Sequence, residues 1–153
     1  GPQEYHKGRV ASMVFHAFNQ YNAEKEVKLF KSHKDGYKDG YQLRDFVYIK
    51  DVTNVMYFLM KEASAPSGVY NLGTGSARAF YELAKSTVEA ADGDAGKIKF
   101  VEMPEDLRGK YQYFTEAKMD KLKKAGYSKD FTALEDGVKD YVQNYLMKED
   151  KYL

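Results

Sequence analysis

Apolar residues recur at the spacing of an amphipathic helix in several parts of the chain. Between about Arg9 and Ala23 they stand three or four positions apart, which predicts a helix there. A second helix is predicted after Asp51, which stands where an N-cap residue should, and a third carries the apolar positions of residues 80–88. These three helices supply apolar faces for a core.

The last third of the chain is predicted to be mainly helical. Thr115 can cap a segment that ends at Gly126. Thr132 and Glu135 have the T-x-x-E spacing of a capping box, which predicts a final helix that ends near Met147.

Short β-prone runs separate the helices. The loops between them are predicted at residues 33–42, which hold glycines, charges and tyrosines without a helical period, and at residues 104–112. Strand followed by helix, repeated, is typical of an α/β fold with some parallel pairing. The strands are predicted at residues 27–32, 45–49, 68–75 and 97–103.

Composition restricts what this α/β unit can be. The chain has 153 residues, of which 43% are hydrophobic, so it can bury the core of one compact domain. A net charge of +1 argues against a protein held on nucleic acid by bulk charge. There is no cysteine, and three scattered histidines form no metal-binding pattern. No run approaches the ~20 apolar residues of a membrane-spanning helix.

Candidate chemistry gathers in four polar loops. Each contributes cations, and two place an aromatic side chain beside the cation, which suits a phosphate attached to a flat base. A diphosphate nucleotide is therefore a candidate ligand, whereas the other interpretation is a solvated surface, since 24 Lys and Arg residues reach most loops by chance. The loops are QEYHKGR at 3–9, FKSHK at 30–34, LRDF at 43–46 and LRGKYQ at 107–112.

Taken in order, these stretches resemble the C-terminal half of the ADP-L-glycero-D-manno-heptose 6-epimerase family, within the extended short-chain dehydrogenase/reductase superfamily. The resemblance covers almost the whole chain, and an inserted tyrosine-rich loop at 33–42 departs from it. The motifs that carry it are GPQEYHKG, KLFKS, RDFVYIKDV, GVYNLGTGSARAF and LRGKYQYFTEAKMDKLKKAGY.

The resemblance implies a fold and an activity. The chain would be the C-terminal, mainly substrate-binding portion (residues 1–153) of a Rossmann-type NAD(P)-binding enzyme, entered in mid-protein at Gly1. The glycine-rich NADP turn and the Tyr-x-x-x-Lys pair would lie upstream, so the chain alone is expected neither to hold NADP nor to turn over substrate. The reaction implied is NADP-dependent inversion of C6 in ADP-heptose, for lipopolysaccharide synthesis, by a cytoplasmic homo-oligomer.

The resemblance also implies roles for single residues. Lys7, in the GPxExHK motif, would be the second acid/base and a cofactor contact. Two other hypotheses for the function of the chain remain: another nucleotide-sugar epimerase or dehydratase of the superfamily, or a non-enzymatic binding module. The positions implied to bind substrate are Arg9, His16, Phe30, Lys31, Ser32, His33, Arg44 and Tyr111.

Overall fold

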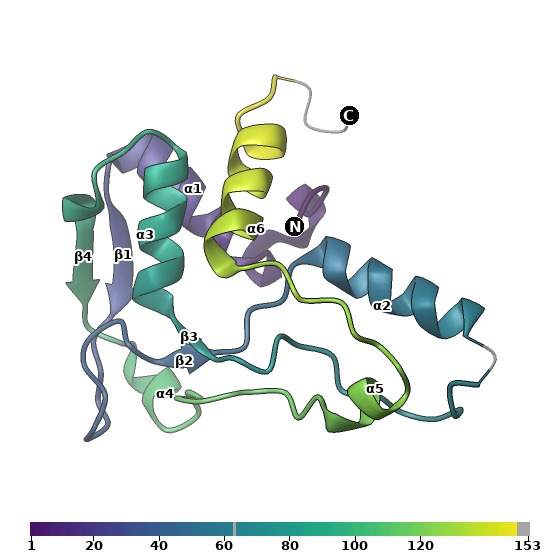
Figure 1. Cartoon of the computed structure of the whole chain (residues 1–153). Coiled ribbons are helices and arrows are strands. Elements are labelled where there is room, and N and C mark those ends of the chain that lie inside the picture. Colours follow the sequence, from purple (N-terminus) through teal and green to yellow (C-terminus); the bar gives the residue numbers. More distant parts are fainter. Residues whose placement is uncertain (63, 150–153) are drawn as a thin grey trace.

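The computed structural model of the chain describes residues 1–62 and 64–149, which form short strands among a larger set of helices (Figure 1). The α-helices are α1 Met13–Glu24, α2 Ile49–Lys61, α3 Phe80–Ala90, α4 Glu105–Arg108, α5 Asp120–Lys124 and α6 Leu134–Tyr141. The strands are β1 Val27–Phe30, β2 Leu43–Arg44, β3 Arg78–Ala79 and β4 Ile98–Val101. Two 3₁₀ segments, η1 Tyr5–Val10 and η2 Ala95–Lys97, and a π-helical turn, η3 Val142–Leu146, complete the set.

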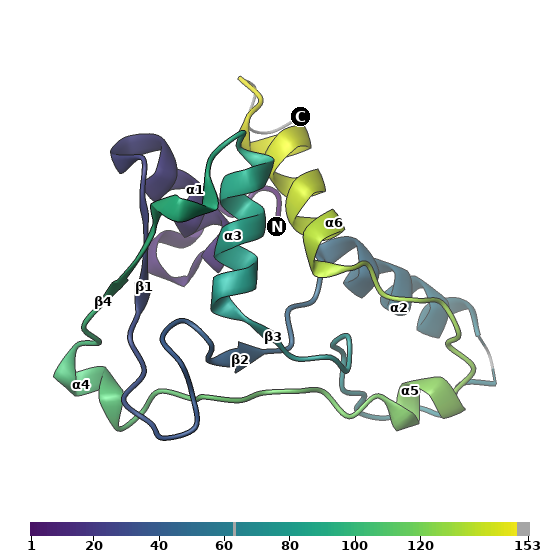
Figure 2. The ribbon, with the colours of Figure 1, turned by 60° about the vertical axis from the view of Figure 1, so that its left-hand side comes forward.

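Three helices form the larger part of the core. α3 packs against both α1 and α6, and α6 continues directly into η3 (Figures 1 and 2). Phe18 of α1, Leu83 of α3 and Val138 of α6 are buried in the cluster between these helices. Burial of such side chains stabilises by about 1.5–3 kcal/mol each, so this cluster anchors the two ends of the chain to each other.

A two-stranded parallel sheet covers the other side of α1 and α3. β1 pairs with β4 in the register Val27 to Ile98. The inward side chains of β1, Val27 and Leu29, are buried against Ala84 and Val88 of α3. The parallel pairing confirms the α/β architecture that the sequence predicts.

A smaller cluster lies between α2 and α5. Val55 of α2, Leu122 of α5 and Tyr127 are buried together, with Leu72 packed against them. Helix α2 therefore packs against a later part of the chain and stands apart from the three-helix layer (Figure 2).

The strands β2 and β3 form a short antiparallel pair, in which Leu43 lies opposite Ala79. A bridge from Leu43 to Phe114 brings the 111–115 segment beside β2, and the backbone N–H of Leu43 donates to Tyr113 at 2.9 Å. Three segments that are far apart in sequence therefore meet around Arg44.

The first helices begin at other residues than predicted. Residues 9 and 10 belong to η1, and α1 begins at Met13, because Ser12 is its N-cap and its Oγ accepts from the N–H of Phe15. Helix α2 starts after Tyr48, so the prediction of Asp51 as its N-cap is wrong. The buried carboxylate of Asp51 instead accepts from the backbone and hydroxyl of Thr132.

The predicted caps in the last third are also wrong, although both predicted helix ends are confirmed. The N-cap of α5 is Met119, and that of α6 is Ala133. The Thr132–Glu135 capping box does not form, because Thr132 donates to Asp51 and Glu135 accepts from Arg78. Gly126, with a φ of +100°, follows the C-cap of α5, and Met147 is the C-cap of η3.

Two predicted strands are absent from the described residues. Residues 45–48 and 68–75 are irregular, and Ile49 begins α2. These segments have the apolar composition that is typical of strands, but within residues 1–62 and 64–149 no neighbouring strand pairs with them. The loop at 104–112 contains α4, and the loop at 33–42 folds back on the protein, since Gln42 is buried.

No helix in the described parts of the chain is long and apolar enough to cross a membrane. Those residues also contain no cluster of three His, Asp or Glu side chains suited to a metal ion.

Candidate functional site

Arg44 lies at the centre of an aromatic cluster. Its guanidinium carbon is 5.7 Å from the ring centre of Tyr111 and 5.9 Å from that of Phe80. The Tyr111 ring also contacts Phe30 edge-on, with the ring centres 6.2 Å apart. A cation held over two aromatic rings is partly fixed in orientation before any ligand arrives. We call Phe30, Arg44, Phe80 and Tyr111 the Arg44 cluster.

The 30–33 run continues from this cluster along the end of β1. The side-chain amide of Gln42 donates to the carbonyls of Phe30 and Lys31, each at 3.4 Å. The backbone N–H of Ser32 donates to Asp39 at 2.7 Å, and that of His33 donates to the hydroxyl of Tyr113 at 2.9 Å. Side chains of the following loop, together with Tyr113 from a distant segment, thus hold the run in place.

One carboxylate contacts several basic side chains of this region. Glu102 accepts from Lys31 Nζ at 2.8 Å and lies 3.2 Å from His33 Nε2 and 3.5 Å from Arg108 Nη2. The hydrogen bond from Lys31, with the neighbouring positive charges, lowers the pKa of Glu102, and the same bond raises the pKa of Lys31. An anionic ligand that replaced this carboxylate would meet two or three cations.

Asp45 follows Arg44 in the sequence and fixes the end of strand β2, which carries Arg44. Its carboxylate accepts from the N–H groups of Thr74, Gly75 and Ala117 at 2.7–2.9 Å, and from the hydroxyl of Thr74. Burial alone raises the pKa of Asp45, but these hydrogen bonds outweigh it and the pKa is lowered. Gly73 is required beside it, since a Cβ there would lie 2.4 Å from Asp45 Oδ2.

Lys7 and Arg9 lie on η1, at the other end of the first helix. Both side chains are exposed, and Gly8 between them turns the chain with a φ of +53°. His16 lies on α1, and its ring contacts Phe15. Its Nε2 is buried and has no hydrogen-bond partner among residues 1–62 and 64–149. Such a nitrogen could accept from or donate to a ligand.

The predicted residues therefore form two groups. Phe30, Lys31, Ser32, His33, Arg44 and Tyr111 are together, whereas Lys7, Arg9 and His16 belong to η1 and α1. In the part of the chain that the structure describes, no hydrogen bond, ion pair or ring contact joins the second group to the first.

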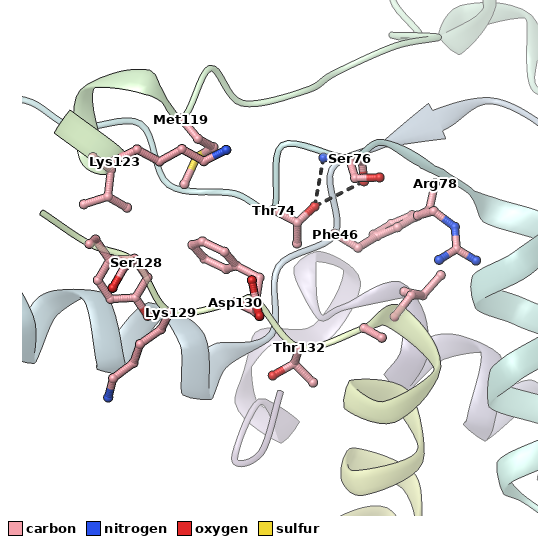
Figure 3. Close-up of a pocket in the computed structure, with 15 residues that line it drawn as sticks. Phe46, Thr74, Ser76, Arg78, Met119, Lys123, Ser128, Lys129, Asp130 and Thr132 are labelled. Atoms are coloured by element: carbon pink, nitrogen blue, oxygen red, sulfur yellow. Dashed lines mark hydrogen bonds between the residues drawn. The ribbon is translucent and has the colours of Figure 1, made fainter.

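A separate cavity lies elsewhere. About 590 Å³ in volume, it lies between the 74–78 turn and the segment that joins α5 to α6, with Lys123 and Arg78 at opposite sides (Figure 3). None of the predicted site residues lines it. Arg78 is already paired with Glu82 and Glu135, and Thr132 with Asp51, so much of its polar lining is engaged in internal contacts. The Arg44 cluster is the better candidate on its chemistry.

Several residues of the site were not predicted. Phe80 and Tyr113 lie within the GVYNLGTGSARAF and LRGKYQYFTEAKMDKLKKAGY motifs, but nothing in the sequence separates them from ordinary core aromatics. Glu102 follows a strand without any pattern of its own. Arg108 lies in the LRGKYQ loop, where the density of cations and aromatics was the available indication.

Comparison with known proteins bears on this geometry. The NAD dependent epimerase/dehydratase family matches residues 1–73. A Fusobacterium nucleatum protein named ADP-L-glycero-D-manno-heptose-6-epimerase is 60% identical over 158 aligned positions, which include all of this chain and 47% of the relative. A Nitratidesulfovibrio vulgaris protein of the same name is 46% identical, with the same coverage. The chain thus spans about half the length of these relatives.

Solved structures give the same fold. The Helicobacter pylori ADP-L-glycero-D-manno-heptose-6-epimerase superposes with a TM-score of 0.70 at 34% identity, over 94% of this chain and 40% of that one. A UDP-N-acetylglucosamine 4-epimerase from Methanobrevibacter ruminantium superposes with a TM-score of 0.73 over 94% of this chain and 42% of its own, and at 16% identity it supports the fold alone. The chain is thus similar over its whole length to about half of these ADP-L-glycero-D-manno-heptose-6-epimerases, and it has the α/β fold of the extended short-chain dehydrogenase/reductases.

Proposed function

We propose that the chain is the substrate-binding portion of an ADP-L-glycero-D-manno-heptose 6-epimerase, which inverts C6 of ADP-D-glycero-D-manno-heptose. The observation that carries the proposal is Arg44, held over Tyr111 and Phe80 beside the cations of the 30–33 run. Relatives at 46% and 60% identity bear this enzyme's name, which favours it over other nucleotide-sugar epimerases and over a binding module.

The Arg44 cluster suits the ADP part of such a substrate. A planar guanidinium makes paired contacts with phosphate oxygens, and the hydroxyl of Tyr111 adds a further donor. Burial raises the pKa of Tyr111, so its hydroxyl stays protonated at neutral pH and can donate. Lys31, Ser32 and His33 contribute further donors, while Arg9 and His16 are assigned to the sugar end.

Proton transfer is assigned to Lys7. When bound, NADP supplies the acceptor and donor of a hydride, which turns the C6 alcohol into a transient ketone and back with no net redox change. Lys7 would move the proton of the C6 hydroxyl on one face, as general acid and base. Lys7 is exposed on η1, beside Gly8 with its φ of +53°, which leaves its side chain accessible in this chain.

The proposed enzyme also implies a cofactor, an assembly state and a cellular location. We infer NADP as the cofactor, with Lys7 as its contact in this chain, and a homo-oligomeric enzyme of lipopolysaccharide-core synthesis in the cytoplasm. Residues 1–153 would be its C-terminal portion, and the glycine-rich NADP turn and catalytic tyrosine would come from the N-terminal portion.

The test is epimerisation by the complete protein that contains this chain. Purified protein with NADP would be given ADP-D-glycero-D-manno-heptose, and proton NMR would follow the configuration at C6. Accumulation of the L-glycero epimer supports the proposal. Inversion of a different nucleotide sugar, with ADP-heptose left unchanged, would assign the chain to another epimerase of the superfamily.

A further inference from the structure

Glu4 is a buried carboxylate that the proposed chemistry does not use. Only 3% of the residue is exposed, and its side chain sits where the start of the chain meets α6. Ser12 donates to it through both its N–H, at 2.6 Å, and its hydroxyl. The hydroxyl of Tyr141 donates to it at 2.8 Å. Three donors from Ser12 and Tyr141 thus converge on this one carboxylate.

These contacts close the loop that carries Lys7. The carboxylate of Glu4 joins the first residue of the loop to Ser12, eight positions later, and the backbone carbonyl of Glu4 accepts from the N–H of Lys7 at 3.0 Å. Ser12 Oγ in turn accepts from the N–H of Phe15, so the same hydroxyl caps α1. The loop from Glu4 to Ser12 is therefore tied to a helix at its end.

Tyr141 ties the loop to the core. This tyrosine is buried in the cluster of α1, α3 and α6, with only 2% of it exposed. Burial and the contact with Glu4 raise the pKa of Tyr141, so its hydroxyl remains a donor to the carboxylate. Glu4 thereby connects the backbone around Lys7 to the buried core of α1, α3 and α6, while the Lys7 side chain stays exposed.

We propose that Glu4 is the positioning residue of Lys7, an inference that rests on the proposed function of Lys7. An ionised carboxylate accepts from every donor that faces it, whereas the amide of a glutamine would turn its NH₂ group toward at least one of them. Glu4→Gln therefore breaks the closure of the loop while leaving the volume of the side chain unchanged. Misplacement of a reacting group by about 1 Å costs on the order of 10²-fold in rate.

Limited trypsin digestion measures the closure directly, because Lys7 is exposed and trypsin cuts after lysine. In the complete protein, the rate of cleavage after Lys7 is followed by mass spectrometry relative to cleavage after Lys38, an exposed lysine in the 33–42 loop. We expect Glu4→Gln to raise this ratio by about tenfold or more, the effect of losing a charged hydrogen bond.

Asp51→Asn is the matched control. Asp51 is also a buried carboxylate, 5% exposed, and it ties a different loop through Thr132. Its substitution removes a comparable contact and should leave the Lys7 to Lys38 cleavage ratio within about twofold of wild type. An unchanged ratio in Glu4→Gln, or an equal rise in Asp51→Asn, overturns the positioning role. Tyr141→Phe removes a single donor from Glu4 and replaces Glu4→Gln in the test if that variant fails to fold. The Lys7 to Lys38 cleavage ratio of Tyr141→Phe should rise between twofold and tenfold.

Kinetics complete the test. Glu4→Gln should lower kcat by about 10- to 100-fold while the Kd for ADP stays within about twofold, since ADP is assigned to the Arg44 cluster. A normal kcat contradicts the inference. If the wild-type protein converts no ADP-heptose, the proposed function fails, and the digestion ratio still decides whether Glu4 orders the loop.

Discussion

Arg44→Ala is the substitution that most directly probes the diphosphate site. The guanidinium is held over Tyr111 and Phe80 at 5.7 and 5.9 Å, and its Nη1 donates to the carbonyl of Leu43 at 3.2 Å. Little side-chain entropy is therefore lost when a phosphate binds to it, so most of the charged hydrogen bond appears as affinity.

The expected magnitude follows from that geometry. A hydrogen bond to a charged group contributes about 1.5–3 kcal/mol, which corresponds to a rise of about 10- to 150-fold in Kd. Arg44→Lys should lie between wild type and Arg44→Ala, because an ammonium keeps the charge but loses the planar, paired contact. Tyr111 and Phe80 stay in place in both variants, so stability should change by less than affinity does.

Calorimetric titration of ADP into the complete protein measures the effect. Lys123→Ala is the control, since Lys123 is an exposed cation that lines the 590 Å³ cavity instead (Figure 3). Its Kd for ADP should equal that of wild type. An Arg44→Ala protein that binds ADP as wild type does would refute the assignment of ADP to the Arg44 cluster. A loss of affinity in Lys123→Ala would indicate instead that ADP binds in the cavity lined by Lys123.

Two further predictions concern carboxylates. Glu102→Gln should tighten ADP binding by a few fold, because it frees Lys31 from an exposed ion pair, and His33 from a neighbouring carboxylate, that compete with the ligand; calorimetry that shows equal or weaker binding would contradict this. Burial alone would raise the pKa of Glu4, but hydrogen bonds, those from Ser12 and Tyr141 among them, lower it. A depressed carboxyl pKa stabilises the fold above the unfolded pKa and loses that effect as the pH falls through the folded pKa. Urea unfolding of wild type should therefore weaken more than that of Glu4→Gln between pH 5 and pH 2, by about 1.4 kcal/mol for each unit by which the pKa is lowered; parallel losses in both proteins would be inconsistent with it.

The sequence predicts helices better than it predicts their first residues. The periodicity of residues 9–23 locates α1, but its start depends on Ser12, whose partners include Glu4. Thr132 has the right neighbours for a cap, yet its hydroxyl donates to Asp51, 81 positions away. A local pattern cannot anticipate a long-range acceptor.

The candidate site divides in the same way. Motifs lead to Arg44 and to the 30–33 run, because cations beside aromatics are visible in a linear sequence. Phe80 completes the Arg44 cluster only because β2 and β3 pair, and Glu102 reaches Lys31 and His33 only because β4 lies beside β1. Residues 45–49 and 68–75 are predicted as strands from their composition, but composition does not specify a pairing partner.

The catalytic assignment of Lys7 is the central claim, and Lys7→Met tests it most directly. The side chain is exposed on a loop, so its removal should preserve the thermal melt and the Kd for ADP. The complete wild-type protein and the variant would be compared in the rate of C6 inversion of ADP-heptose. We expect a fall of about 10²- to 10⁴-fold, the usual contribution of a positioned acid or base, with no recovery in Lys7→Arg because guanidinium stays protonated. A folded Lys7→Met protein that binds ADP and inverts ADP-heptose at a near-normal rate would rule out Lys7 as the proton-transfer residue.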